Sequence, residues 1–232
     1  MKINGLQKLT LLDFPGHVAC TVFSAGCDLR CPFCHNASLV IGEAEEIMGE
    51  EEFFSFLSKR TGILDGVAFT GGEPLMQRGI LDFAKRIREM GFAVKLDTNG
   101  TFPDRLRDMI DAGAVDYVAM DIKNSPAKYS RTVGVDVDGG LFEKIRESAA
   151  MLISGGNVDY EFRTTVTAEL HDKDDFLAIG EWIRGARRYY LQQFRDSGEL
   201  LGGGLSAPTP DAMAEFADIV RPYVGEVGLR GV

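Results

Sequence analysis

The chain has little of what marks several common protein classes. It has no apolar run near the roughly 18 residues that a membrane-spanning helix needs. Its first segment, MKINGLQKLTLLDFPG, lacks the long apolar region and the small-residue cleavage site of a signal peptide. Basic residues number 25 against 35 acidic ones, and the formal net charge of −10 argues against a broad nucleic-acid surface. We therefore expect a cytoplasmic protein that binds neither membrane nor nucleic acid.

Histidine and cysteine are also scarce. The three histidines, His17, His35 and His171, form no obvious catalytic triad. A disulfide framework is not expected from the 4 cysteines of a 232-residue chain, because a chain of this length can bury its own core. The same number leaves no room for a second, ferredoxin-like cluster beside a first one. The length fits one domain, which we expect to span residues 1–232.

Three of the cysteines lie close together. Cys27, Cys31 and Cys34 stand in the run GCDLRCPFCHN, residues 26–36, with the spacing CxxxCxxC. Three thiolates at this spacing can hold three irons of a [4Fe-4S] cube, which leaves the fourth iron without a protein ligand. An open metal position can bind a substrate or a cofactor directly. The spacing therefore predicts a reactive iron–sulfur site.

Two simpler interpretations of these cysteines stay open at this point. A structural zinc site normally needs four ligands, and the fourth cysteine, Cys20, lies in VACTVFS, which has the pattern of a buried strand. His35 could supply the fourth ligand, although its position next to Cys34 makes a tetrahedral arrangement awkward. Plain packing in the core is the other interpretation.

Short β-rich segments alternate with amphipathic helical ones along the chain. We expect strands at residues 18–24, 65–70, 92–97, 115–122, 158–166 and 187–194. The apolar spacing predicts helices at residues 49–62, 77–91, 141–153, 174–183 and 209–220. Strands that alternate with helices predict an α/β fold with a parallel sheet. Since a complete eightfold barrel needs about 250 residues, we expect a partial (β/α)6 barrel with long loops at 124–140 and 195–208.

Polar residues follow three of the expected strands. The segments are TGGEP (70–74), DTNG (97–100) and MDIK (120–123). In a parallel barrel the groups that carry chemistry gather at the carboxyl ends of the strands. Glycines allow close approach of a ligand to the backbone, and the carboxylates and Lys123 can bind ammonium and carboxylate groups. Taken singly, each segment is also an ordinary turn or strand cap.

Taken together, these segments resemble the radical S-adenosylmethionine (SAM) superfamily, whose CxxxCxΦC signature matches CDLRCPFC with Phe33 as the aromatic residue. The resemblance implies a TIM-like barrel in which Cys27, Cys31 and Cys34 hold a [4Fe-4S] cluster, and SAM binds the fourth iron. An electron from the reduced cluster then cleaves SAM, and the 5'-deoxyadenosyl radical that forms abstracts a hydrogen atom. An external donor such as flavodoxin or ferredoxin must supply that electron.

The segments LTLLDFPG, CHN, DTNG and MDIK narrow the resemblance to the activases of glycyl radical enzymes, and most closely to the anaerobic ribonucleoside-triphosphate reductase activating proteins. This resemblance implies an oxidoreductase that generates a glycyl radical on a partner enzyme. It implies SAM-binding roles for Phe33, His35, Asn36, Gly71, Gly72, Glu73, Pro74, Asp97, Thr98, Asn99, Asp121, Lys123, Arg163 and Gln193. In that family the aspartates can also help to hold a monovalent cation, here beside Asp97.

Three other functions remain as alternatives. The partner could be an enzyme like pyruvate formate-lyase, or the chain could be a radical SAM enzyme that acts on a small molecule. The third alternative is a non-catalytic iron–sulfur electron-transfer module. That module would have a fully ligated cluster and no use for GGEP, DTNG or MDIK.

Overall fold

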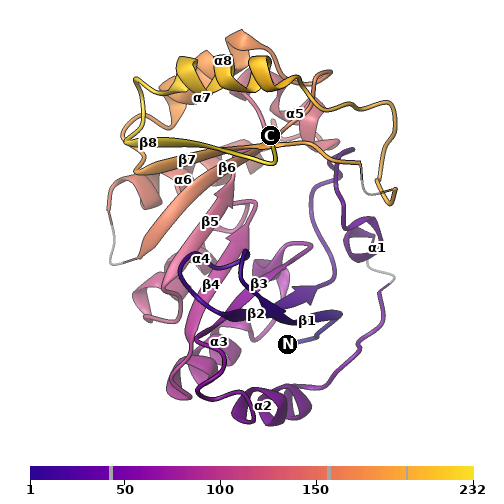
Figure 1. The fold of residues 1–232 in the computed structure, drawn as a ribbon, viewed down its shortest axis with the longest axis vertical. Helices are drawn as coiled ribbons and strands as arrows, with labels where there is room; N and C mark the ends of the chain where they lie inside the picture. The colour runs from indigo at the N-terminus through magenta and orange to yellow at the C-terminus, as the bar shows by residue number, and fades with distance from the viewer. Residues whose placement is uncertain (42–43, 156–157, 197) are drawn as a thin grey trace.

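The described residues contain eight strands, which form one sheet in chain order from β1 to β8 (Figure 1). The computed structural model describes residues 1–41, 44–155, 158–196 and 198–232. Strand β1 (Gly5–Thr10) pairs antiparallel with β2 (Ala19–Ser24), and every later strand pairs parallel with the one before it. The later strands are β3 (Gly66–Gly71), β4 (Ala93–Thr98), β5 (Tyr117–Asp121), β6 (Asp159–Val166), β7 (Arg188–Gln193) and β8 (Glu226–Arg230).

Helices fill the connections between these strands. They are α1 (Ala37–Val40), α2 (Glu50–Ser58), α3 (Ile80–Glu89), α4 (Pro103–Asp111), α5 (Tyr129–Val133), α6 (Leu141–Ile153), α7 (Lys173–Trp182) and α8 (Pro210–Val220), with short 3-10 turns η1 (Pro74–Met76) and η2 (Pro126–Lys128). Helix α3 packs against β4, and α8 packs against α7, β7 and β8. None of the helices within the described ranges is long and apolar enough to cross a membrane.

The α/β fold and the six predicted strands are confirmed, as β2 to β7. The five predicted helices are confirmed as α2, α3, α6, α7 and α8, and the structure adds α4 in the third crossover. The predicted loop at 124–140 is wrong in part, because it contains η2 and α5. The loop at 195–208 contains no helix or strand among its described residues, and residue 197 lies outside them.

Strands β1 and β8 were missing from the prediction. Both are edge strands and much of their length is half-buried or exposed, so neither has the apolar run of a central strand. Strand β8 also contains Gly228, and a side chain there would meet the ring of Tyr190. The sheet is therefore the predicted six-strand unit with one further strand on each edge.

One face of the sheet packs on the main hydrophobic core, and the other carries charged side chains beside a smaller apolar cluster of Phe14, Ala19, Tyr117 and Ala119. In β4, Val94 and Leu96 are fully buried in the main hydrophobic core, whereas Lys95 and Asp97 alternate with them and point to the other face. The same alternation in β6 puts Glu161 and Arg163 on that second face. This second face therefore carries the charged side chains of β4 and β6.

An ion pair between a half-buried arginine and a buried carboxylate attaches the edge strand β8 to this charged face. Arg230 of β8 donates from Nη1 and Nη2 to the two carboxylate oxygens of Glu161, at 2.7 and 2.8 Å. The Tyr117 hydroxyl donates to Glu161 at 2.7 Å, and Glu161 is only 1% exposed. Burial by itself raises the pKa of Glu161, but the bonds from Arg230 and Tyr117 outweigh it, so that the pKa is lowered. The carboxylate therefore stabilises the fold above the ordinary Glu pKa and loses that effect as the pH falls.

We predict that Arg230→Met lowers the free energy of unfolding at pH 7 by about 2–3 kcal/mol, because it leaves the buried carboxylate of Glu161 without its cation. The control is Arg221→Met, whose exposed pair with Asp218 should contribute less than about 0.5 kcal/mol. Urea unfolding measures both variants. Because Glu161 must be ionised to pair with Arg230, the loss of unfolding free energy in Arg230→Met should become smaller as the pH is lowered. Equal losses in the two variants at pH 7 would contradict this account.

Candidate active site

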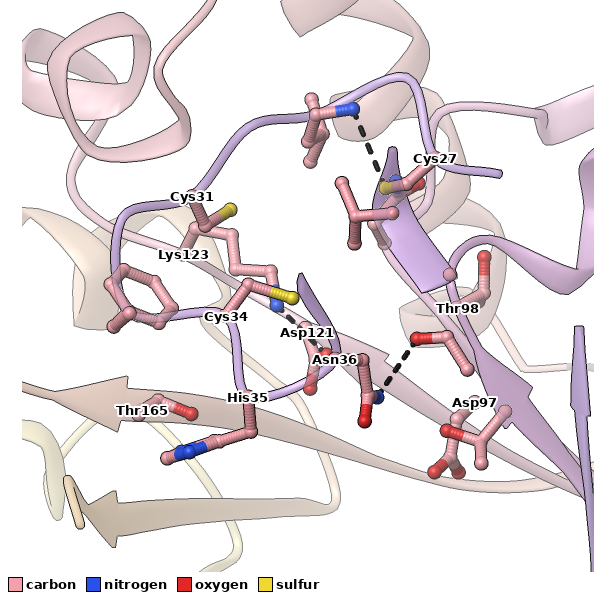
Figure 2. Close-up of a pocket in the computed structure, with 17 residues that line it drawn as sticks. Cys27, Cys31, Cys34, His35, Asn36, Asp97, Thr98, Asp121, Lys123 and Thr165 are labelled. Carbon is pink, nitrogen blue, oxygen red and sulfur yellow. Dashed lines mark hydrogen bonds and ion pairs between the residues drawn. The ribbon is translucent and has the colours of Figure 1, made fainter. Parts of the chain in front are cut away.

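A cavity of about 170 Å³ lies at the carboxyl ends of β3, β4, β5 and β6, beside the loop that follows β2. It is lined by Cys27, Leu29, Cys31, Phe33, Cys34, His35, Asn36, Val40, Thr70, Gly71, Gly72, Asp97, Thr98, Asn99, Asp121, Lys123 and Thr165. Figure 2 shows the three cysteine side chains around one space, with Lys123 and Asp121 beside them. The structure thus brings together segments that are up to about 140 residues apart in the chain.

The three cysteines of this cavity fit an iron–sulfur cube. Cys27, Cys31 and Cys34 are free thiols, and within the described ranges no three His, Cys, Asp or Glu side chains converge to hold a single metal ion. A cube binds each thiolate on a different iron, so its ligands surround a volume and do not converge on a point. Cys20 lies in β2, fully buried in the core and outside the cavity wall. The donor set therefore fits a cluster held by three cysteines.

Burial keeps two of these thiols neutral when no metal is bound. It raises the pKa of Cys27 to about 12 and that of Cys31 to about 11. A coordinated metal ion deprotonates a thiol outright, so binding of a cluster here would release protons. Cys27 and Cys31 would therefore become thiolates when they bind a metal ion, whose positive charge stabilises the deprotonated sulfur.

Two glycines at the end of β3 allow close packing against the end of β2 and against the cluster loop, the segment 25–36 that carries the three cysteines. Gly72 donates its backbone N–H to Ser24 at 2.8 Å, and Glu73 donates its N–H to Gly26 at 2.8 Å. A Cβ on Gly72 would lie 2.0 Å from the Gly26 oxygen, and one on Gly71, whose φ is +114°, would lie 2.4 Å from the Ser24 oxygen. Both glycines line the cavity, but the contact that excludes a side chain is made with the protein's own backbone.

Four further contacts hold the cluster loop. Asn99 donates from Nδ2 to Asp28 at 2.9 Å and reaches the sulfur of Cys27 at 3.7 Å. The backbone N–H of Arg30 donates to Val133 of α5 at 2.7 Å, and Gly202 donates to Pro32 at 2.9 Å. A hydrogen bond to a ligand sulfur is one of the factors that set the potential of a cluster.

The side chain of Glu73 is turned away from the cavity. Its carboxylate is 1% exposed and accepts from Leu75 N at 2.9 Å, Thr98 Oγ1 at 2.9 Å and Asn99 N at 2.7 Å. Burial raises the pKa of Glu73 to about 7, although these bonds oppose the shift. Neither Glu73 nor Pro74 lines the cavity in this structure. In this structure, the Glu73 carboxylate connects the ends of β3 and β4 through its hydrogen bonds with Thr98 and Asn99.

Alternating charges connect the ends of β4, β5 and β6. Asp97 pairs with Lys95 and, at 3.3 Å, with Nη1 of Arg163. Arg163 Nε donates to Asp121 at 2.9 Å, and Lys123 Nζ donates to the other oxygen of Asp121 at 2.9 Å. Burial would raise the pKa of Asp121, but the charges of Arg163 and Lys123 outweigh it and lower this pKa to about 2. Arg163 pairs with both aspartates but does not line the cavity. Of the three cations Lys95, Arg163 and Lys123, only Lys123 lines it.

Aromatic and amide groups complete the wall. The ring centre of Phe33 lies 5.9 Å from Nζ of Lys123, and the ring of His35 stacks on Phe194 with a centroid distance of 5.8 Å. Asn36 donates from Nδ2 to the Gly71 oxygen at 3.0 Å (Figure 2). Gln193, by contrast, donates to the Pro208 oxygen at 2.8 Å and lies outside the cavity wall.

Four residues of the wall were not predicted. Leu29, Val40, Thr70 and Thr165 line the cavity, and although Thr70 stands in the TGGEP segment, the resemblance assigns a role to none of the four. Thr165 could have been found, because it follows Arg163 by two residues in a strand and must share its face. Leu29 and Val40 give no such signal, since only the folded loop brings them to the site.

Comparisons with known proteins agree with this site. The model of the radical SAM superfamily matches residues 21–182. A Methanocaldococcus jannaschii protein with the provisional name glycyl-radical enzyme activating enzyme is 30% identical over 99% of this chain and 96% of its own. A 7-carboxy-7-deazaguanine synthase of Thermococcus kodakarensis is 29% identical over 62% of each chain. The crystal structure of a radical SAM methyltransferase from Sphaerobacter thermophilus matches with a TM-score of 0.69 and 17% identity, over 96% of this chain and 68% of the other.

We predict that replacing any one cluster ligand abolishes cluster binding, whereas Cys20→Ala preserves it. Cys34→Ala leaves two thiolates for the cube, and the expected iron content after anaerobic reconstitution is below a quarter of the wild-type value. Cys20→Ala removes only buried packing volume and should cost about 1 kcal/mol of stability. Iron and sulfide analysis measures the difference, and loss of the cluster in Cys20→Ala would show that this reading of the ligands is wrong.

We predict that Gly72→Ala impairs the cluster loop. The new methyl group would overlap the Gly26 oxygen, and the backbone must move at a cost of about 1–3 kcal/mol. The matched control is Gly139→Ala, where a Cβ meets nothing within 4 Å. Unfolding free energy and iron content are the measurements. A stable Gly72→Ala protein with full iron content would contradict the role of this contact.

Proposed function

Since the chain belongs to the radical SAM superfamily, we propose that it is an activase that cleaves SAM reductively at a [4Fe-4S] cluster and generates a glycyl radical on a partner enzyme. The observation that carries this proposal is the full-length similarity to the M. jannaschii protein, which extends over almost the whole of both chains. The match to the deazaguanine synthase, in contrast, covers less than two thirds of each chain.

The cavity supplies groups suited to both cofactors. Cys27, Cys31 and Cys34 would hold the cluster, and the cluster would supply the electron for SAM cleavage and an open iron for SAM. The ammonium of Lys123 is the cation in the cavity wall and suits the carboxylate of SAM. By resemblance, the segment Gly71 to Glu73 would bind its amino group, and Asp97 and Asp121 would surround its methionine portion. Of the residues assigned by resemblance, Glu73, Pro74, Arg163 and Gln193 would act from outside the wall.

Hydrogen-atom transfer from a glycine requires no base. The radical carbon derived from SAM takes a hydrogen atom, and the glycine keeps the unpaired electron, so that no net charge moves. This is consistent with the histidines of the site region: His35 stacks on Phe194, and His171 is buried, with Nε2 3.0 Å from the Lys123 oxygen. The protein's task is then to hold SAM and to admit a peptide segment of the partner.

For the partner we propose an anaerobic ribonucleoside-triphosphate reductase, on the resemblance of LTLLDFPG and CHN to its activating proteins. The loop at 195–208 is a candidate for contact with the partner, because its Gly202 is bonded to the cluster loop. The electron donor would be a flavodoxin or a ferredoxin. The alternative partner is an enzyme like pyruvate formate-lyase, and the alternative substrate is a small molecule such as those of the deazaguanine synthases.

We predict a glycyl radical on the partner. The reconstituted, reduced protein is mixed with SAM and with a candidate reductase under anaerobic conditions, and electron paramagnetic resonance should show a glycyl doublet. Lys123→Met, with unchanged iron content, should lose at least ten-fold in radical yield, because the carboxylate of SAM loses its cation. No signal with any glycyl radical enzyme, together with turnover of a small molecule, would favour the alternative function.

A further inference from the structure

Lys95 is a buried lysine close to the position predicted for a monovalent cation. Its side chain is 2% exposed, and its ammonium pairs with the Oδ1 atom of Asp97. Lysine is rarely buried to this extent unless its charge is paired. Lys95 stands in the middle of β4, two residues before Asp97 and on the same face of the strand, and it does not line the cavity. Its ammonium therefore reaches Asp97 from the side away from the cavity.

The side-chain oxygens at this edge of the cavity already have partners. Asp97 accepts from Lys95 on one oxygen and from Arg163 on the other. Asp121 accepts from Arg163 and from Lys123 in the same way. The Thr98 hydroxyl donates to Glu73 at 2.9 Å and accepts from Gly100 N at 3.1 Å. A hard cation binds through oxygen atoms, so it would have to share these carboxylate oxygens with the donors that already bind them.

The charges at this position also oppose a further cation. Three protein cations, Lys95, Arg163 and Lys123, face the two carboxylates of Asp97 and Asp121. Like charges repel more strongly in a poorly solvated interior than in water. Even if Lys123 turned to the carboxylate of SAM, Lys95 and Arg163 would still neutralise both aspartates. The residues present do not fit a bound sodium or potassium ion.

We propose that the ammonium group of Lys95 takes the place of the monovalent cation beside Asp97, so that SAM cleavage at this site needs no added sodium or potassium ion. The proposal rests on the proposed SAM site but not on the identity of the partner. A cation fixed to β4 holds the carboxylate of Asp97 in position. The chain therefore carries its own counter-ion where its relatives are expected to recruit one.

The first test uses the unaltered protein. The reconstituted enzyme, reduced by photoreduced deazaflavin so that no metal cation is added, is given SAM in tetramethylammonium, sodium or potassium buffers of equal ionic strength. The measured quantity is the rate of 5'-deoxyadenosine formation, which needs no partner protein. The expected rates agree within two-fold. A fall of five-fold or more in tetramethylammonium would overturn the proposal.

The second test removes the ammonium. Lys95→Met keeps the length of the side chain and frees an oxygen of Asp97, so its rate should fall at least ten-fold in tetramethylammonium and recover in potassium or sodium. Lys85→Met removes an exposed lysine of α3 and should respond to none of the salts. A folded, iron-loaded Lys95→Met protein that stays active without metal cations, or that no cation restores, would overturn the proposal.

Thallium(I), a substitute for potassium with an observable nucleus, measures binding directly. With the cluster oxidised and SAM added, thallium-205 resonance should show no bound ion in the wild-type protein, and a bound ion in Lys95→Met supports the proposal further. A saturable thallium site in the wild-type protein that Asp97→Asn removes would overturn it. This measurement needs no turnover, so a failure of SAM cleavage would count against the proposed function and leave this result intact.

Discussion

The series of ion pairs from Lys95 to Lys123 is the constraint on which the site depends. Its members lie on three adjacent strands, β4, β5 and β6, except Lys123, which follows β5, and each carboxylate in the series is held by two cations. Buried charges are tolerated only when they are paired in this way. Removing one member of the series therefore leaves the charge of its neighbour uncompensated. The series fixes the carboxyl ends of the strands, and it brings a single ammonium, that of Lys123, to the cavity wall.

The cluster loop depends on a different kind of constraint, which is the absence of side chains. Gly71 and Gly72 let the end of β3 touch the end of β2 and the start of the loop, and no other residue could occupy Gly72 without moving the Gly26 carbonyl. Asn99 then joins the loop to β4, and Glu73 joins β3 to β4. The loop that carries the cysteines is thus positioned by the same strand ends that carry the polar groups proposed to bind SAM. This arrangement would place the two proposed cofactors side by side.

Much of this architecture could be predicted from the sequence because its signals are local. The cysteine spacing, the two glycines and the polar strand ends are each contained in a few residues, and the central strands are either short apolar runs or alternate apolar and polar residues. Strands β1 and β8 could not be predicted because edge strands lack such runs. Two contacts could not be predicted either: the carboxylate of Glu73 points away from the cavity and bonds to Thr98 and Asn99, and Lys95 pairs with Asp97. Both depend on contacts between strands that the sequence does not specify.

The function as an activase is tested most directly by following the hydrogen atom. A partner enzyme that contains glycine deuterated at the α carbon is activated with unlabelled SAM, and the 5'-deoxyadenosine is analysed by mass spectrometry. If the chain generates a glycyl radical by direct abstraction, the product gains one deuterium atom in the first turnover. Formation of 5'-deoxyadenosine without deuterium, while the partner becomes active, would contradict the account.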